Sequence, residues 1–395
     1  MIPISSFPSF TLSLWVCLLL SAACTKSAPS PGSDSKDPDT AAGPTGMGAD
    51  EAPTNAAAGT HALLEDLRMM VNACTFDDKT VPSVECYQKM TKRMSTEEHK
   101  ALWHRAPNLS LEALSQALGA ADPKAYQVAA SVFNNLVGDL VARSREGQSV
   151  VVDRAAVVRL LNLAGQLKAR EPEITLAIPL TRLALLAGLE KELFALADSM
   201  GGLFQAAVIR FSMREARMTV FPRIRDYVQS GSPEVKKAAL KAANLPDPTP
   251  EEKAVLCPWA RSLLHLEVPE QLATVFVILA TCGGEHVDAL LTRAEALPSG
   301  AFASGMMGAF SALMAHLTAA GAVPGDPVSV GQQARLQKLL FRIIEDEKAP
   351  AELRAGSIRA FGNDPLGTEV KTFLSRFAAH KELPIRKAVE KVLKK

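Results

Sequence analysis

Residues 232–243 read SPEVKKAALKAA, and the same pattern returns twice near the end of the chain as PAELRAGSIRAF and LPIRKAVEKVL. Each copy has a proline near its start, an apolar residue followed by a basic one, and then small or apolar residues at helical spacing. The apolar–basic pairs are Val235–Lys236, Leu353–Arg354 and Ile385–Arg386. Because self-similarity at a fixed period is typical of repeat architectures, the pattern predicts stacked helical hairpins.

The spacing of the copies gives the length of the repeated unit. Leu353 and Ile385 are 32 residues apart, which fits one helical hairpin. Val235 and Leu353 are 118 residues apart, which predicts about four such hairpins between them. A weaker copy, DPKAYQVAASVF, begins at Asp122 and extends the pattern toward the N-terminus.

Helical signals continue through most of the chain from His61 onward. Asp153 is the expected N-cap of a helix whose apolar residues recur at i, i+3 and i+4. Ser95 and Glu98 have the spacing of a capping box. The chain of 395 residues is 48% hydrophobic but only 5% aromatic, and no segment alternates as a strand would. We therefore predict an all-α domain over residues 61–395.

At two places, residues 221–243 and 349–395, the pattern resembles HEAT-type repeats, whose units often carry a proline at the turn and a valine–arginine pair at the start of a helix. The resemblance implies an α-solenoid in which neighbouring hairpins share a continuous apolar core. The alternative is an irregular helical bundle in which the copies match by chance.

The N-terminus has the features of an export signal. Residues 11–23 form a short apolar block that ends in small residues, although the first ten residues contain no Lys or Arg. Ala22, Ala23 and Cys24 match the lipobox of bacterial lipoproteins, with Leu20 one position early because Ser21 stands between. The resemblance implies a signal peptide over residues 1–23, lipidation of Cys24 and, since Thr25 is not aspartate, the outer membrane. The alternative is an ordinary signal peptide in which Cys24 is incidental.

Residues 24–60 are predicted to be a disordered tether. After Cys24 the segment is rich in Pro, Gly, Ser, Ala and Asp, and Met47 is its one large apolar residue. Such a composition cannot bury enough surface to offset the entropy of ordering. A flexible chain of this length reaches roughly 30 to 35 Å.

Residues 301–321 contain no Asp, Glu, Lys or Arg. Twenty-one residues are enough to span a bilayer. The stretch also holds several Gly and Ser residues and His316, which favours a helix buried inside the solenoid. A transmembrane span is the alternative.

Four cysteines remain once Cys17 and Cys24 are assigned to the signal and the anchor: Cys74, Cys86, Cys257 and Cys282. An even number in an exported chain indicates disulfides, and the two local pairs, 74 with 86 and 257 with 282, are the expected connectivity. Buried free thiols are the alternative. No spacing typical of a zinc site occurs.

The sequence predicts no catalytic residue, no metal site and no cofactor, because none of the common nucleophile, phosphate-loop, dinucleotide or zinc motifs is present. A net charge of +1 also gives no reason to expect a nucleic-acid partner. Basic residues gather in two places that are candidates for a docking surface, although solvated helix faces are the simpler interpretation. The candidates are Arg210, Arg214, Arg217, Arg386, Lys387, Lys391, Lys394 and Lys395.

These features together predict an envelope lipoprotein that acts as a non-catalytic scaffold, with the helical repeat binding a protein or peptide partner. The anchor would hold it to the bacterial outer membrane. An envelope hydrolase acting on cell-wall or lipid material is the alternative function, and a purely structural domain is a third.

Overall fold

The computed structural model describes residues 53–394 except 78–80, 168–172, 321–326 and 364–365. The predicted signal peptide, the lipidation site at Cys24 and most of the predicted tether lie outside the described residues. Residues 52–395 form one compact unit.

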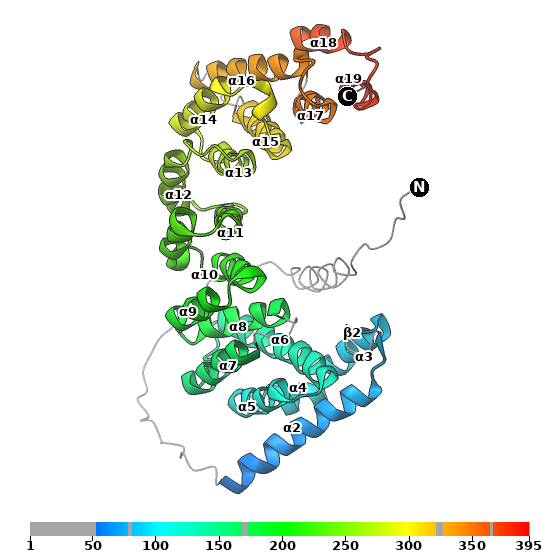
Figure 1. Ribbon diagram of the computed structural model, residues 1–395, viewed down its shortest axis with the longest axis vertical. Helices are drawn as coiled ribbons and strands as arrows, with labels where there is room; N and C mark the ends of the chain where they lie inside the picture. Colours follow the sequence, from blue (N-terminus) through cyan, green and yellow to red (C-terminus); the bar gives the residue numbers. More distant parts are fainter. Residues whose placement is uncertain (1–52, 78–80, 168–172, 321–326, 364–365, 395) are drawn as a thin grey trace, which may run out of the picture. The chain divides into compact units, whose positions relative to one another are not determined.

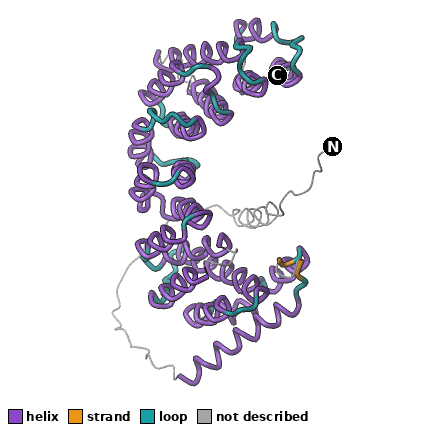
Figure 2. The backbone as a smooth tube through the Cα atoms, in the orientation of Figure 1, coloured by secondary structure: helices purple, strands orange, loops and turns teal. Residues whose placement is uncertain are grey.

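The described chain is all-α and solenoid-like, with one short hairpin of two strands near its start, as Figure 2 shows. Phe76 pairs with Pro82 in that antiparallel hairpin. The elements are α2 (Pro53–Ala73), β1 (Phe76–Asp77), β2 (Val81–Pro82), α3 (Val84–Met94), α4 (Glu97–Trp103), α5 (Pro107–Gly119), α6 (Pro123–Arg145), α7 (Arg154–Gln166), α8 (Glu173–Leu186), α9 (Glu190–Met200), α10 (Gly202–Ser230), α11 (Pro233–Ala243), α12 (Pro250–Ser262), α13 (Pro269–Ala280), α14 (Gly284–Ala296), η2 (Ser299–Ala301), α15 (Ser304–Ala320), α16 (Pro327–Glu345), α17 (Ala351–Ala360), η3 (Phe361–Asn363), α18 (Thr368–Ser375) and α19 (Leu383–Leu393).

From α5 onward the helices alternate between two layers. In one layer, which we call the repeat layer, α6, α8, α10, α11, α13, α15, α17 and α19 each pack against the next (Figure 1). In the second layer α5 packs against α7 and α7 against α9, and further along α12 packs against α14 and α14 against α16. The copies of the sequence pattern form α6, α11, α17 and α19, so all of them fall in the repeat layer.

Helix α10 belongs to both layers because it is broken in the middle. Arg217 has φ 33°, outside the helical region, and Pro222 lies five residues later. A proline inside a helix removes one hydrogen bond and its ring collides with the carbonyl four residues earlier. Before the break Glu215 pairs with Arg182 of α8 in the repeat layer, and after it Phe221 packs edge-on against Trp259 of α12 in the second layer.

The apolar members of the repeated pattern are core residues, as the pattern predicts. Val235, Leu353 and Ile385 are all buried, and they belong to one continuous apolar cluster that runs along the described chain. The predicted number of units is wrong, however. From α11 to α17 the repeat layer advances by three hairpins, through α13 and α15. The units are longer here because α15 and α16 have 17 and 19 residues, against 10 and 8 in α17 and α18.

Helix α15 accounts for most of the uncharged stretch at residues 301–321. It packs against α13, α16 and α17, and it buries Met306, Phe310 and Leu313. Small residues let the helices approach closely, since a Cβ added at Gly305 would lie 3.2 Å from the Cβ of Ala273. Among the helices in the described part of the chain, none has the length and hydropathy needed to cross a membrane.

Helix α2 begins at Pro53, inside the segment predicted to be the tether. The sequence here is PTNAAAGTH, and alanine is the best helix former, so the helix extends back from the apolar face that starts at Leu63. The close approach of Gly59 to Leu109 of α5 shows that this early turn is already packed.

Candidate binding surface

Five basic side chains gather on the solvent face of α10 and α11. The first half of α10 buries Phe204, Val208 and Ile209, so that its opposite face points to solvent. The start of α11 is fixed by Ser232, whose hydroxyl accepts a hydrogen bond from the backbone N–H of Val235. These two helices pack extensively against each other. The five residues, which we call the α10–α11 basic patch, are Arg210, Arg214, Lys236, Lys237 and Lys241.

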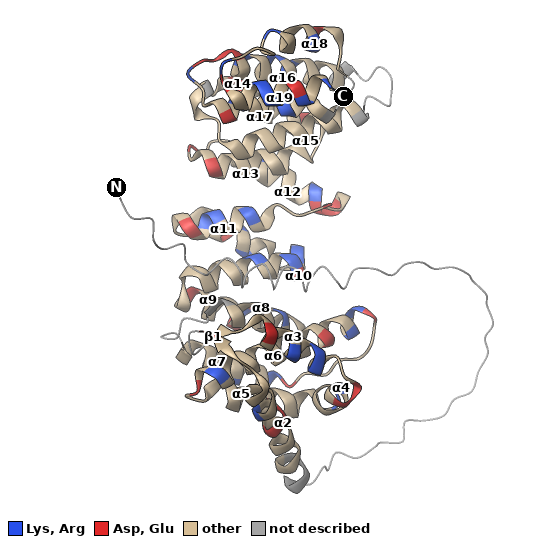
Figure 3. Cartoon of the chain, turned by 90° about the vertical axis from the view of Figure 1, so that its right-hand side faces the viewer, with Lys and Arg blue, Asp and Glu red and all other residues tan. Residues whose placement is uncertain are grey.

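Among the described residues, the side chains of the basic patch have no hydrogen-bond or ion-pair partner. The nearest carboxylate on α10, that of Glu215, is occupied by Arg145 and Arg182. Glu234 in the first turn of α11 makes no ion pair with the lysines that follow it. In Figure 3 the blue segments of the α11 ribbon, which mark Lys and Arg positions, lie directly above α10, whose ribbon also carries blue segments.

The second layer differs because several of its arginines are paired with carboxylates of a neighbouring helix. Successive helices from α9 to α18 are each joined by such a pair, which leaves these guanidinium groups occupied. The pairs are Arg223–Asp198, Arg217–Glu252, Arg261–Glu285, Arg335–Asp288, Arg335–Glu295 and Arg376–Glu345.

Arg217 therefore does not join the stripe that the sequence predicts with Arg210 and Arg214. The break in α10 turns it toward α12, where its Nη1 lies 2.8 Å from Oε2 and 3.1 Å from Oε1 of Glu252. Glu252 is buried and also completes the capping box of α12 with Thr249. The role of Arg217 is to neutralise this carboxylate.

Beyond the basic patch, the repeat layer presents an uncharged surface on α13 and α15. Glu270, in the first turn of α13, is the one charged residue of that helix, and α15 has none. Figure 3 shows both helices above α11, tan except where α13 carries Glu270. The residues that face solvent here are mostly small, and we call them the neutral face: Thr274, Gly308, Ala312, Ala315 and His316.

The second predicted basic group lies on α19. Arg386, Lys387, Lys391 and Lys394 are all exposed, whereas Lys395 lies outside the described residues. Arg386 donates to the carbonyl of His380, and Lys394 pairs with Glu390 one turn earlier. The cations of α19 are thus partly occupied, and α17 separates them from the neutral face.

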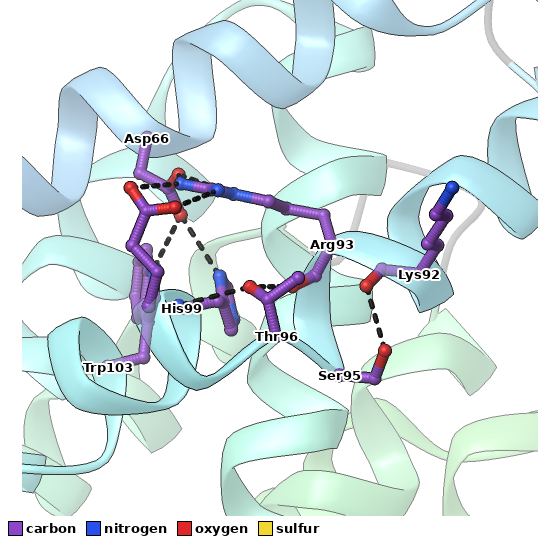
Figure 4. Close-up of polar contacts among 8 residues, drawn as sticks. Asp66, Lys92, Arg93, Ser95, Thr96, His99 and Trp103 are labelled. Atoms are coloured by element: carbon purple, nitrogen blue, oxygen red, sulfur yellow. Dashed lines mark hydrogen bonds and ion pairs between the residues drawn. The ribbon is translucent and has the colours of Figure 1, made fainter.

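A buried polar cluster lies at the N-terminal end of the described chain (Figure 4). Asp66 of α2 is 1% exposed and accepts hydrogen bonds from Arg93 of α3 at 2.9 Å and from Trp103 of α4 at 2.8 Å. Nδ1 of His99 lies 3.1 Å from the same carboxylate. Arg93 also reaches the exposed Glu98. We call Asp66, Arg93, His99 and Trp103 the Asp66 cluster.

The Asp66 cluster fixes three helices to one another. Burial raises the pKa of Asp66, but the hydrogen bonds from His99, Trp103 and Arg93 lower it by more, to about 2. His99 is fully buried. A carboxylate held ionised without access to solvent has the properties of a structural ion pair.

Sequence reasoning missed the Asp66 cluster, although one signal was present. Asp66 lies on the face of α2 that carries Leu63, Leu67 and Met70. A carboxylate at an apolar position needs a buried partner. The partners are 27 to 37 residues away along the chain, so the fold was needed to identify them.

Both expected cysteine pairs are disulfides in the structure. Cys74 at the end of α2 is bonded to Cys86 of α3, and Cys257 of α12 is bonded to Cys282 after α13. The first closes the loop that holds β1 and β2, beside the Asp66 cluster. The second joins the middle of α12 to the residue that follows the end of α13, beside Pro248 and Lys253 near the start of α12.

Two hollows occur on the described residues, and neither is an enclosed cavity with converging titratable groups. The larger hollow is open, lies between α12 and α14, and is lined by Arg261, Glu285, Asp288 and Thr292. Arg261 and Glu285 already pair there at 3.0 Å. Within the described ranges, no three His, Cys, Asp or Glu side chains converge in a way that would hold a metal ion.

No protein-family model matches this chain, and no curated protein matches it.

Proposed function

We propose that this chain is an exported, lipid-anchored scaffold of the bacterial envelope. Its repeat layer binds a protein partner and has no catalytic role. The observation that carries the proposal is the contrast between the layers. The second layer uses several of its arginines in ion pairs between helices, whereas α10 and α11 leave five cationic side chains without partners among the described residues, beside an uncharged surface. A solenoid offers such an extended surface because each hairpin adds one helix to it.

Two further features support export and anchoring. Disulfides form and persist in oxidising compartments, and the described residues contain two of them. The apolar block before Cys24 resembles a lipoprotein signal, and about thirty residues separate Cys24 from α2. One acyl-modified cysteine followed by a polar segment would hold the solenoid near a membrane and give it reach.

The anchor is tested by labelling with radioactive palmitate in a bacterial host. We expect the parent chain to be labelled and to fractionate with membranes, and the Cys24→Ala variant to lose both properties. Equal labelling of the two chains contradicts the anchor.

The scaffold is tested by photo-crosslinking in the same host. A photoreactive residue replaces Ala312 of the neutral face in one variant and Val330 of α16, exposed in the second layer, in the control. We expect one adduct of defined mass from position 312 and none of that mass from position 330. The same adducts from both positions, or none from either, contradict a partner-binding repeat layer.

A further inference from the structure

We infer that the α10–α11 basic patch and the neutral face together bind an extended acidic segment of a partner protein. The inference rests on the proposed scaffold function and adds the chemistry and length of the bound segment. It follows from the charge of the patch, from its place in the layer, and from the size of the side chains next to it.

The charge of the patch selects an anionic partner. Arg210, Arg214, Lys236, Lys237 and Lys241 have no carboxylate within ion-pair distance among the described residues, and Glu234 and Glu270 are the acidic residues at the borders of the surface. Unpaired cations create a local positive potential that attracts anions and accelerates their association. The patch would meet carboxylates without first breaking an internal ion pair.

The place of the patch in the layer gives the length of the segment. α10, α11, α13 and α15 follow one another as packed neighbours. Packed helices lie about 8 to 10 Å apart, so three steps cover about 24 to 30 Å. An extended chain rises about 3.3 Å per residue, so a segment of about nine residues crosses the four helices.

The side chains of the neutral face select a polypeptide over a membrane. Gly308, Ala312 and Ala315 are small and leave the helix surface open to a backbone, while Thr274 and His316 can exchange hydrogen bonds with it. Membrane-surface helices instead insert large apolar side chains below the headgroups. Among the described residues of α13 and α15, none is an exposed large apolar side chain.

The test uses a fluorescent nine-residue peptide with four acidic residues followed by alanine, glycine and serine. Its binding to the purified full-length chain is measured by fluorescence anisotropy at low salt. We expect Lys237→Glu combined with Lys241→Glu to raise Kd about tenfold, because two favourable charge contacts become repulsive. The control, Lys92→Glu with Lys191→Glu on α3 and α9, makes the same change of net charge at exposed lysines outside the patch and should leave Kd within about twofold.

A second variant tests the neutral face without touching the patch. Ala312→Glu places a carboxylate under the bound segment and should weaken binding, while Val330→Glu in the second layer should not. Circular dichroism checks that the charge-reversal variant on α11 is folded. If it is not, the variant with Lys237→Gln and Lys241→Gln replaces it and should show a smaller loss of affinity for the peptide.

Two outcomes would overturn the inference. One is that the peptide fails to bind, or binds equally to patch and control variants. The other is that vesicles of phosphatidylglycerol, or a single-stranded oligonucleotide, bind through the patch more tightly than the peptide does. Either result is compatible with the proposed scaffold function if position 312 still gives its crosslinked adduct of defined mass. The failure of the inference and that of the proposed function are therefore distinguishable.

Discussion

Replacing Asp66 by Asn should destabilise the N-terminal helices in a way that depends on pH. The side chain of Asp66 is almost fully buried, and its carboxylate accepts hydrogen bonds from Arg93 and Trp103. The asparagine is nearly the same size, so the variant removes the charge and leaves the packing. Arg93 then loses its buried anionic partner.

The magnitude follows from the pKa of Asp66. The folded chain lowers it from an ordinary 3.8 to about 2. Since one pH unit corresponds to about 1.4 kcal/mol, the ionised form contributes about 2.5 kcal/mol to the free energy of unfolding at pH 7. A depressed acid pKa stabilises the fold above its unfolded value, and this contribution is lost as the pH falls from about 4 toward 2. About half of it should remain at pH 3.

The assay is urea denaturation followed by tryptophan fluorescence. Trp103 belongs to the Asp66 cluster, so in a background with Trp15→Phe and Trp259→Phe its emission reports the unfolding of α2, α3 and α4. We expect Asp66→Asn to unfold at lower urea than the parent at pH 7, with the gap about halved at pH 3. The control Glu112→Gln removes an exposed carboxylate that lies 3.4 Å from Arg159 and should cost less than about 1 kcal/mol.

Two results would refute this reasoning. Equal urea midpoints for parent and variant at pH 7 would mean that the carboxylate contributes nothing. A gap of the same size at pH 7 and pH 3 would mean that the variant disturbs packing and that ionisation is not the cause.

Two further predictions concern the covalent and steric features of the solenoid. Replacing Cys257 and Cys282 together by Ala removes a disulfide of sequence separation 25, which should lower the free energy of unfolding by about 3 kcal/mol. Urea denaturation followed by the fluorescence of the neighbouring Trp259 measures the change. An unchanged urea midpoint would show that the bond adds no stability. Gly231→Ala should lower the free energy of unfolding by about 1 to 3 kcal/mol, because the new Cβ would lie 2.6 Å from the carbonyl oxygen of Tyr227. Gly308→Ala, which has open space around its new Cβ, should be neutral or stabilising. Thermal melts compare the two variants, and equal melting temperatures would contradict the steric argument.

The features that the sequence predicts correctly depend on local order. Val235, Leu353 and Ile385 are buried because helical periodicity is a property of a dozen consecutive residues. The two disulfides join neighbours along the chain, so the local pairing was the natural expectation. The number of hairpins between α11 and α17 was wrong because unit length varies with helix and loop length, which two distant copies do not reveal.

The features that the sequence did not predict depend on contacts between distant segments. A stripe of Arg210, Arg214 and Arg217 requires that α10 is continuous. Pro222 in the sequence indicates a break in this helix. Lys237 and Lys241 were part of the quoted repeat, but their grouping with Arg210 and Arg214 follows from the packing of α11 against α10.

The division of charge between the layers bears directly on binding. An arginine already paired with a carboxylate offers little to a ligand, because its pair must be broken or shared. The second layer pairs its arginines at successive interfaces from α9 to α18, so those charges contribute to holding the helices in register. In the repeat layer, small residues such as Gly305 and Ala273 let α13 and α15 pack closely, and the cationic side chains of the basic patch have no partner among the described residues. The same separation explains why charge reversal at Lys237 and Lys241 should change affinity while leaving the fold intact: the residues that would bind are not those that hold the solenoid together.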